Sequence, residues 1–238
     1  MMSNSNTTVV LVHGAFAENA SWNGVIERLA QNGVRALAAS NLLRSVSGDA
    51  DYVADVVREI DGPVVLVGHS YGGMVITQAA PALENVKALV YVGAFAPDSG
   101  ESALQLTSLY PGSSLGEAVS GVELTSGGTD LTIRPELFHQ QFCGDVDDAT
   151  AALMGATQRA ISDRALNEPL GSAIPGWRTL PSWFVYGAAD RNIPAEALGF
   201  FAERAGSKGT TVVEEASHAI AVSQPDVVTR TILAAIAG

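Results

Sequence analysis

The sequence has only one cysteine, Cys143, among its 238 residues. One thiol excludes a disulfide within the chain, and so little cysteine is typical of a reducing compartment. Long apolar runs are also missing, since no segment approaches the roughly 18 uninterrupted apolar residues of a transmembrane helix. The N-terminal stretch MMSNSN is polar and has no basic residue, unlike a secretory signal peptide. We therefore expect a cytoplasmic protein without a membrane-spanning helix.

Basic residues are scarce, with 13 Lys and Arg against 25 Asp and Glu and a formal net charge of −12. This excess of negative charge argues against nucleic acid and anionic membranes as partners. The glycine-rich signatures of nucleotide binding do not occur, neither the Walker loop with its Lys and Ser/Thr nor G-x-G-x-x-G. The four histidines are scattered and Cys143 has no ligand partner nearby, so we predict neither a metal site nor a cofactor.

Strand-like and helix-like segments alternate along most of the chain, and 47% of the residues are hydrophobic. This length and composition are enough for one large domain. Strands that are apolar throughout and separated by helices are typical of a parallel sheet covered on both faces. We predict a doubly wound α/β domain with a mainly parallel, six-stranded sheet. The expected strands are 7–12, 34–40, 63–67, 86–95, 181–190 and 209–218, and the expected helices are 21–33, 49–60, a segment after Gly73, 194–206 and 224–238.

The alternation stops between residues 97 and 176. This stretch contains turn-rich sequences such as PDSGES and SGGTD beside short helical patterns such as RPELFHQQF. A structureless loop of this length would be unusual inside a compact domain. We expect 97–176 to be a small, mostly helical insertion that caps a pocket, within a core formed by 1–96 and 177–238. The alternative is an ordinary excursion that completes the core.

The sequence GHSYG, residues 68–72, lies where the strand 63–67 meets the next helix. A G-x-S-x-G pattern at a strand-to-helix junction forces a sharp turn that lifts the serine above the sheet. Bulky side chains at Gly68 and Gly72 would meet across such a turn, which explains the spacing. Ser70 is therefore a candidate nucleophile. The alternatives are a passive serine in a glycine-rich turn and a phosphate-binding loop.

A serine needs a base that removes its proton before it can attack, and the sequence has four histidines. His218 follows the last strand, and it can reach Ser70 because the carboxyl ends of parallel strands share one edge of the sheet. We expect His13 to be architectural and His69 to point down into the fold. His139 lies in the insertion, where it could line a pocket or lie on the surface. We therefore predict His218 as the base.

A histidine base needs a carboxylate that fixes its tautomer and stabilises its charged form. Asp190 follows the fifth strand and lies between Ser70 and His218 in the chain order Ser, Asp, His. Asp98, after the fourth strand, is the competing candidate. The glutamates at 214 and 215 are closer to the histidine in sequence, but we expect them to face outward. We predict Asp190 as the acid.

A tetrahedral intermediate needs N–H donors that are already in place. Two backbone amides are expected to supply them: that of Tyr71, directly after the candidate nucleophile, and that of Ala15, in the loop after the first strand. Phe16, Phe138 and the Tyr71 ring are candidates for an apolar substrate pocket, and ordinary packing is the alternative for each of them.

In combination, the stretches VVLVHGAF, LVGHSYGG, VYGAADRNIP and ASHAIAVSQPD resemble the motifs of the α/β-hydrolase superfamily, and the resemblance covers nearly the whole chain. The chain is most similar to small bacterial carboxylesterase-type members related to the plant methylesterase and hydroxynitrile lyase group. The resemblance implies Ser70 as nucleophile, Asp190 as acid, His218 as base, and the Ala15 and Tyr71 amides as oxyanion donors. It also implies a cap, and a sheet without the two leading strands of the superfamily.

Departures from sister families narrow the chemistry that the resemblance implies. Haloalkane dehalogenases and epoxide hydrolases carry an Asp nucleophile where this chain has Ser70, and the hydroxynitrile lyases place a Lys where Ala219 follows His218. We predict a cofactor-free serine hydrolase that cleaves small carboxylic esters through an acyl-enzyme on Ser70. The alternatives are a lyase, perhydrolase or oxygenase that uses the same triad, and a small-molecule receptor with little turnover.

Overall fold

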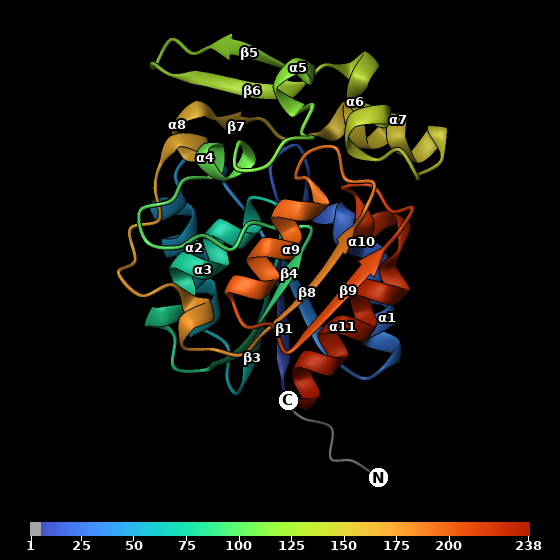
Figure 1. Ribbon diagram of the computed structural model, residues 1–238. Helices are drawn as coiled ribbons and strands as arrows, with labels where there is room; N and C mark the ends of the chain where they lie inside the picture. Colours follow the sequence, from blue (N-terminus) through green and yellow to red (C-terminus); the bar gives the residue numbers. More distant parts are fainter. Residues whose placement is uncertain (1–5) are drawn as a thin grey trace.

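The core of the protein is a six-stranded sheet in the order β2-β1-β3-β4-β8-β9 (Figure 1). The computed structural model describes residues 6–238, and residues 1–5, most of the MMSNSN stretch, lie outside the described residues. Every neighbouring pair of strands is parallel, so the predicted α/β fold with a six-stranded sheet is confirmed. The strands are β1 Thr8–Val12, β2 Arg35–Ala39, β3 Val64–His69, β4 Val86–Val92, β8 Ser182–Gly187 and β9 Gly209–Val213.

Helices cover both faces of this sheet, as Figure 1 shows. The side chains of β1 alternate between the faces. Val9 and Leu11 pack in one buried apolar cluster with residues of α1 and α11, whereas Val10 and Val12 pack in another with residues of α2, α3 and α9. Burial on both faces explains why the strands are apolar throughout. The core helices are α1 Asn23–Gln31, α2 Val46–Arg58, α3 Gly72–Ala79, α9 Ala195–Arg204, α10 Ile220–Ser223 and α11 Pro225–Ala237, with short 3-10 helices at η1 Asn19–Trp22, η2 Ala80–Ala82 and η3 Gly176–Arg178.

Some element ends differ from the expected ones. The helix expected from residue 49 begins at Val46, because the Ser45 hydroxyl caps the first turn by accepting a hydrogen bond from the Gly48 amide at 3.1 Å. The strand expected over 209–218 ends at Val213, since the chain turns there and the Ala216 amide donates back to the Val213 carbonyl at 3.2 Å. The residues after this turn therefore form a loop at the edge of the sheet.

The segment 97–176 contains short helices, as expected, and also a small sheet that was not predicted. The sheet is antiparallel and has the order β5-β6-β7. Its first turn contains Gly127 and Gly128, which both have a positive φ, the conformation that tight hairpin turns require. The elements of the segment are α4 Ala103–Thr107, α5 Leu115–Ala118, β5 Val119–Glu123, β6 Thr129–Ile133, α6 Pro135–Phe142, α7 Asp148–Thr157, β7 Ile161–Ser162 and α8 Asp163–Asn167.

These elements lie over one end of the core, at the top of Figure 1. Backbone hydrogen bonds join them to loops that follow core strands. The Phe16 amide, in the loop after β1, donates to the Arg159 carbonyl at 3.1 Å, and the Ala219 amide, in the loop after β9, donates to the Phe142 carbonyl at 3.0 Å. The segment therefore faces the carboxyl ends of the strands, where α/β proteins place their ligands.

Candidate active site

Ser70 occupies the turn between β3 and α3 and has a positive φ of 54°, a conformation that residues other than glycine rarely adopt. Backbone hydrogen bonds hold the turn. The Ser70 amide donates to the Val92 carbonyl at 3.3 Å, and the Ser70 carbonyl accepts from the amides of Gly73 and Phe95 at 3.0 and 3.2 Å. The surrounding structure thus imposes the strained conformation and fixes the serine at the carboxyl edge of the sheet.

Glycines around Ser70 allow this turn to pack against its neighbours. A Cβ atom at Gly68 would lie 2.6 Å from the Gly72 carbonyl oxygen, so this glycine avoids a clash across the turn. A Cβ atom at Gly72 would instead lie 2.4 Å from the Val12 carbonyl oxygen. The prediction that a side chain at Gly72 would clash across the turn was therefore wrong, because this glycine faces β1 and would clash with it. A Cβ atom at Gly14 would lie 2.5 Å from the Ser70 Cβ atom, so the loop after β1 lies directly against the serine.

His218 and Asp190 form a buried, hydrogen-bonded pair. His218 Nδ1 lies 2.6 Å from Asp190 Oδ2, and the two side chains are 1% and 0% exposed. The other carboxylate oxygen accepts from the amides of Asn192 and Ile193 at 2.7 and 2.9 Å. Because a carboxylate accepts hydrogen bonds, Nδ1 of the neutral ring carries the proton, and Nε2 keeps a free lone pair.

The competing carboxylates lie elsewhere. Asp98 forms a partly exposed salt bridge with Arg178, and its Oδ1 accepts from the Ser99 amide at 2.8 Å. The side chains at 214 and 215 are exposed. Of the acids considered from the sequence, the one that the structure brings to His218 is therefore Asp190.

Ser70 and His218 lie against the same end of β4. The Ser70 amide donates to Val92, and a Cβ atom on the next residue, Gly93, would lie 3.8 Å from the His218 carbonyl oxygen and 3.9 Å from its Nδ1. His218 Nε2 is buried and has no hydrogen-bond partner within residues 6–238, the Ser70 hydroxyl included. A buried, unpaired nitrogen costs free energy. It therefore marks a point where a proton donor is expected to bind or approach.

The amides of Ala15 and Tyr71 flank Ser70 from two elements. Tyr71 begins the helical turn after the serine, and Ala15 lies in the loop after β1. Neither amide donates to a backbone carbonyl in the described part of the chain, whereas the next amide along, that of Phe16, donates to Arg159. Two unused N–H groups at a helix N-terminus and a neighbouring loop can stabilise negative charge that develops between them.

His13 and His139 have structural surroundings. His13 is buried, its Nδ1 donates to the Gly14 carbonyl at 2.8 Å, and its Nε2 accepts from the Asn41 amide at 3.4 Å. Burial lowers the pKa of His13 to about 4, so the ring is neutral. His139 donates from Nε2 to the Val146 carbonyl at 2.8 Å within the 97–176 segment. Both rings are thus occupied by backbone contacts.

His69 is buried, in keeping with the expectation that it points into the fold, but its contact with His218 was not predicted. Its ring centroid lies 4.7 Å from that of His218, and its Nε2–H donates to the His218 carbonyl at 2.9 Å. The rings of Trp22 and Phe142 enclose it edge-on. Burial and the adjacent His218 ring lower the pKa of His69 well below its usual value, so it is a neutral support for His218. The one feature of the local sequence that could have indicated a place for His69 in the site is its position directly before Ser70.

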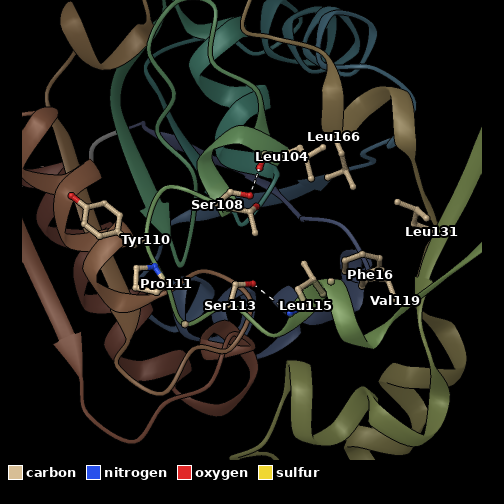
Figure 2. Close-up of a pocket in the computed structure, with 13 residues that line it drawn as sticks. Phe16, Leu104, Ser108, Tyr110, Pro111, Ser113, Leu115, Val119, Leu131 and Leu166 are labelled. Carbon is tan, nitrogen blue, oxygen red and sulfur yellow. Dashed lines mark hydrogen bonds between the residues drawn. The ribbon is translucent and has the colours of Figure 1, made fainter.

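Two apolar pockets share Phe16 in their lining, and we call them pocket A and pocket B. Pocket A has a volume of about 380 Å³ and lies among the elements of the 97–176 segment. In Figure 2 its side chains surround the open space, with Phe16 and Leu131 at one end and Tyr110 and Pro111 at the other. Pocket B, of about 390 Å³, lies between α7 and the loop after β1. Its apolar lining consists of Phe16, Ala17, Ala20, Leu153, Met154 and Val222.

The other two aromatic candidates take different positions. Phe138 is buried, stacks 5.1 Å from the Phe142 ring, and lines neither pocket A nor pocket B. The Tyr71 ring points toward α2, where its hydroxyl donates to Asp49 Oδ2 at 2.9 Å. Their positions favour packing, so of the three aromatic candidates Phe16 alone lines these pockets.

The remaining reactive groups show no second centre. Within residues 6–238, no group of three or more His, Cys, Asp or Glu side chains is placed to hold a metal ion. Burial and the nearby Asp145 raise the pKa of Cys143 to about 12, which keeps this thiol protonated and unreactive. In the same part of the chain, no helix combines the length and apolar character needed to cross a membrane.

Several known proteins are similar to this chain in sequence or in fold. A carbendazim-hydrolysing esterase from Nocardioides sp. (strain SG-4G) is 34% identical over 110 residues, which cover 41% of this chain and 46% of that protein; the match thus spans less than half of the relative's length. Three solved structures share the fold. Polyneuridine aldehyde esterase has a TM-score of 0.80 and 20% identity, and the match covers 98% of this chain and 99% of that one. A methylesterase from Arabidopsis has a TM-score of 0.79 and 18% identity, with 97% of this chain and 99% of that one covered. A pyrethroid hydrolase from Sphingobium faniae JZ-2 has a TM-score of 0.73 and 22% identity, with 97% of this chain and 98% of that one covered. Residues 9–231 match the alpha/beta hydrolase family. The chain therefore belongs to this family.

Proposed function

We propose that this protein is a serine hydrolase that cleaves small carboxylic esters through an acyl-enzyme on Ser70. The observation that carries the proposal is the buried His218–Asp190 pair, in which Nδ1 and Oδ2 lie 2.6 Å apart. This pair lies at the same end of β4 as Ser70, whose backbone is strained and held by hydrogen bonds. A nucleophile, a base and an acid that orients the base are the parts that nucleophilic acyl transfer needs.

The first step is removal of the serine proton. Asp190 holds the proton on Nδ1 of His218, so the lone pair on Nε2 is available to accept the proton of the Ser70 hydroxyl as its oxygen attacks the ester carbonyl carbon. The hydrogen bond between this base and its nucleophile often tightens only when substrate is in place. The C–O double bond then becomes a C–O⁻ single bond, and the imidazolium is stabilised by the Asp190 carboxylate.

The negative oxygen of this tetrahedral intermediate needs donors. The Ala15 and Tyr71 amides, which have no backbone acceptor in the described residues, are the donors we assign. The N-terminus of α3 adds its positive dipole end. Such donors act mainly on the transition state, and the loss of one typically costs roughly 3 kcal/mol.

The intermediate collapses when the bond to the alcohol oxygen breaks. His218 gives its Nε2 proton to the leaving alkoxide, which departs as an alcohol and leaves the acyl group on Ser70. Water then attacks the acyl carbon while His218 removes the proton of the water, and the carboxylic acid is released with Ser70 restored. The reaction needs no cofactor.

The names of the relatives support hydrolysis over the alternatives. Carbendazim-hydrolysing esterase and polyneuridine aldehyde esterase are esterases by name. A lyase of the kind considered from the sequence would carry a Lys beside the catalytic histidine. Here Ala219 occupies that position, is 3% exposed and donates its amide to Phe142.

The proposal includes the segment 97–176 as a cap on the core formed by 1–96 and 177–238. Residues of this segment line both apolar pockets, such as Leu131 in pocket A and Met154 in pocket B. In this proposal the cap supplies all of the lining of pocket A except Phe16 and part of the lining of pocket B, while the reacting groups come from the core. We further propose a cytoplasmic location and a small-molecule substrate rather than a nucleic acid, in keeping with the single cysteine and the net charge of −12.

Hydrolysis of p-nitrophenyl butyrate, with butyrate and nitrophenol measured together, tests the proposal. We expect equal amounts of the two products, and a loss of about 10⁴-fold or more in kcat for Ser70→Ala. Ser120→Ala, an exposed serine in β5, is the matched control and should retain activity. Unequal products, or turnover by Ser70→Ala at the wild-type rate, would contradict the proposal. Ligand binding without turnover of any short-chain ester would favour a receptor.

A further inference from the structure

We propose that the substrates are neutral esters with an apolar group larger than methyl on each side of the ester bond, and that Phe16 separates the two groups. This inference rests on the proposed function. In it, the acyl group and the alcohol group of one ester occupy pocket A and pocket B, one in each, and Phe16 stands between them.

Phe16 lies in the same loop as groups of the proposed site, and a hydrogen bond to the cap holds its backbone. It directly follows Ala15, one of the two amides we assign to the oxyanion, and Gly14, which lies against Ser70. Its φ is 59°, and its amide donates to the Arg159 carbonyl of the cap at 3.1 Å. The strained backbone is held by this hydrogen bond and the side chain is only 4% exposed, so we expect the ring to act as a wall and not as a mobile lid.

The two pockets meet at this wall. Among residues 6–238, Phe16 is the one residue that lines both of them. Their volumes, about 380 and 390 Å³, are nearly equal. The large apolar side chains that line pocket A are Phe16, Leu104, Tyr110, Pro111, Leu115, Val119, Leu131 and Leu166. A methyl ester would leave one of the two pockets without an occupant, so this arrangement favours esters with two sizeable groups.

The charge of the lining selects neutral groups. In the described part of the chain, no charged side chain lines pocket A, and Glu18 is the one charged residue that lines pocket B. A third pocket, near the far side of the His218 loop, has the opposite character and is lined by Glu136, Asp145, Arg191 and Glu215 among others. An anionic substrate group would also meet the net charge of −12 of the whole chain. Alkyl and aryl groups are therefore expected in pockets A and B.

Leu104 and Leu153 extend the apolar surface outward. These side chains line pocket A and pocket B respectively, and they are 47% and 68% exposed. Exposed large apolar side chains at a pocket mouth are typical of an entrance for apolar ligands. Each pocket thus has its own apolar approach from solvent.

Two substrate series separate the pockets experimentally. One series is p-nitrophenyl esters from acetate to octanoate, which varies the acyl group, and the other is alkyl acetates from ethyl to octyl, which varies the alcohol. Each added methylene that enters an apolar pocket is expected to raise kcat/KM about three- to four-fold until the pocket is full. We expect such a rise in both series for the wild-type protein.

Two matched variants then place a large side chain in the pockets, one variant in each pocket. Thr107 at the end of α4 lines pocket A and Thr150 in α7 lines pocket B, and both are half-buried. Thr107→Trp should lower the best chain length in one series and leave the other series unchanged, and Thr150→Trp should do the reverse. Thr211→Trp, on the exposed face of β9 and in the lining of neither pocket, is the control and should change neither series. Thermal unfolding checks that all three variants fold.

Phe16→Ala removes the wall and keeps the Cβ atom, so it leaves the strained backbone as it is. The joined space should accept an ester with one large group, and kcat/KM for p-nitrophenyl dodecanoate relative to butyrate should rise at least about ten-fold. The inference is overturned if this ratio does not rise, if both Trp variants shorten the same series, or if neither shortens any. If the wild-type protein hydrolyses no ester in either series, the proposed function fails instead.

Discussion

Asp190 is the residue on which the orientation of His218 depends. It accepts the Nδ1 proton at 2.6 Å and is itself held by two backbone amides. Asp190→Asn removes the charge and lets the ring adopt the wrong tautomer, so we expect kcat to fall on the order of 10³- to 10⁴-fold. Steady-state hydrolysis of p-nitrophenyl butyrate measures this. Asp98→Asn, which breaks only the surface salt bridge with Arg178, should change kcat less than about two-fold, and a larger loss there would reverse the assignment.

His69 supports His218 through one hydrogen bond and one ring contact. His69→Phe keeps a ring but leaves the buried His218 carbonyl without its donor, at a cost of about 1–3 kcal/mol. We expect kcat to fall about ten-fold or more with little change in KM, because the base and not the pocket is displaced. His69→Gln, which keeps an N–H donor, should recover part of kcat. An equal loss in both variants, or a change in KM alone, would argue against a positioning role.

The residues of the candidate site differ in how far the sequence predicts them. Ser70 and His218 follow strands in recognisable motifs, and Asp190 could be chosen by chain order. His69 and His218 are 149 positions apart in the sequence. Their rings are in contact because the end of β3 and the loop after β9 lie close together in the folded protein. Local sequence carries no record of that approach. The partner of Gly72 was missed for the same reason, since it lies on β1.

The strand-to-helix turn around Ser70 depends on glycine at the scale of whole elements. A Cβ atom at Gly72 would lie 2.4 Å from the Val12 carbonyl oxygen, so Gly72→Ala must push α3 away from β1. We expect the free energy of unfolding to fall by about 3 kcal/mol, measured by urea denaturation. Gly116→Ala in α5 is the control, because a Cβ atom there meets nothing within 4 Å, and it should be neutral or slightly stabilising. Equal effects of the two substitutions would contradict this account.

The small sheet in the 97–176 segment was not predicted from the sequence. The stretch SGGTD, residues 126–130, predicts only a turn, whereas its first three residues belong to the turn of a hairpin between β5 (Val119–Glu123) and β6 (Thr129–Ile133), and its last two begin β6. Two adjacent glycines between short runs are a recognised hairpin signal. These strands could not be predicted from an apolar pattern, because β5 is largely exposed and lacks the apolar residues of a core strand. The core strands were predictable because burial on both faces requires that pattern.

The stability of the whole molecule should depend on pH through His13. Burial lowers its pKa to about 4, below the ordinary 6.5. Between these values the unfolded chain binds a proton that the folded chain does not, so the folded state loses stability as the pH falls. From pH 7 to pH 5 this loss is about 2 kcal/mol. His13→Gln lacks the effect, so the difference in unfolding free energy between the two proteins should shrink by that amount on acidification. A constant or growing difference would contradict the assignment.

At the scale of the whole molecule, the fold class was the most predictable property. Apolar strands separated by helices led to a doubly wound parallel sheet, and the structure has one. Pocket shape was the least predictable, because pockets A and B are formed by side chains from several elements of the 97–176 segment, from the loop after β1 and from the helices α1 and α10. Their positions depend on packing between segments that are distant in sequence.

Covalent labelling of the folded protein tests the central claim most directly. A fluorophosphonate reacts with a serine only where a base has activated it, so intact-mass measurement and peptide mapping should find one adduct per chain, on Ser70. His218→Ala should lose the adduct although Ser70 is present. An adduct on another residue, or equal labelling of wild-type protein and the Ser70→Ala variant, would contradict the account.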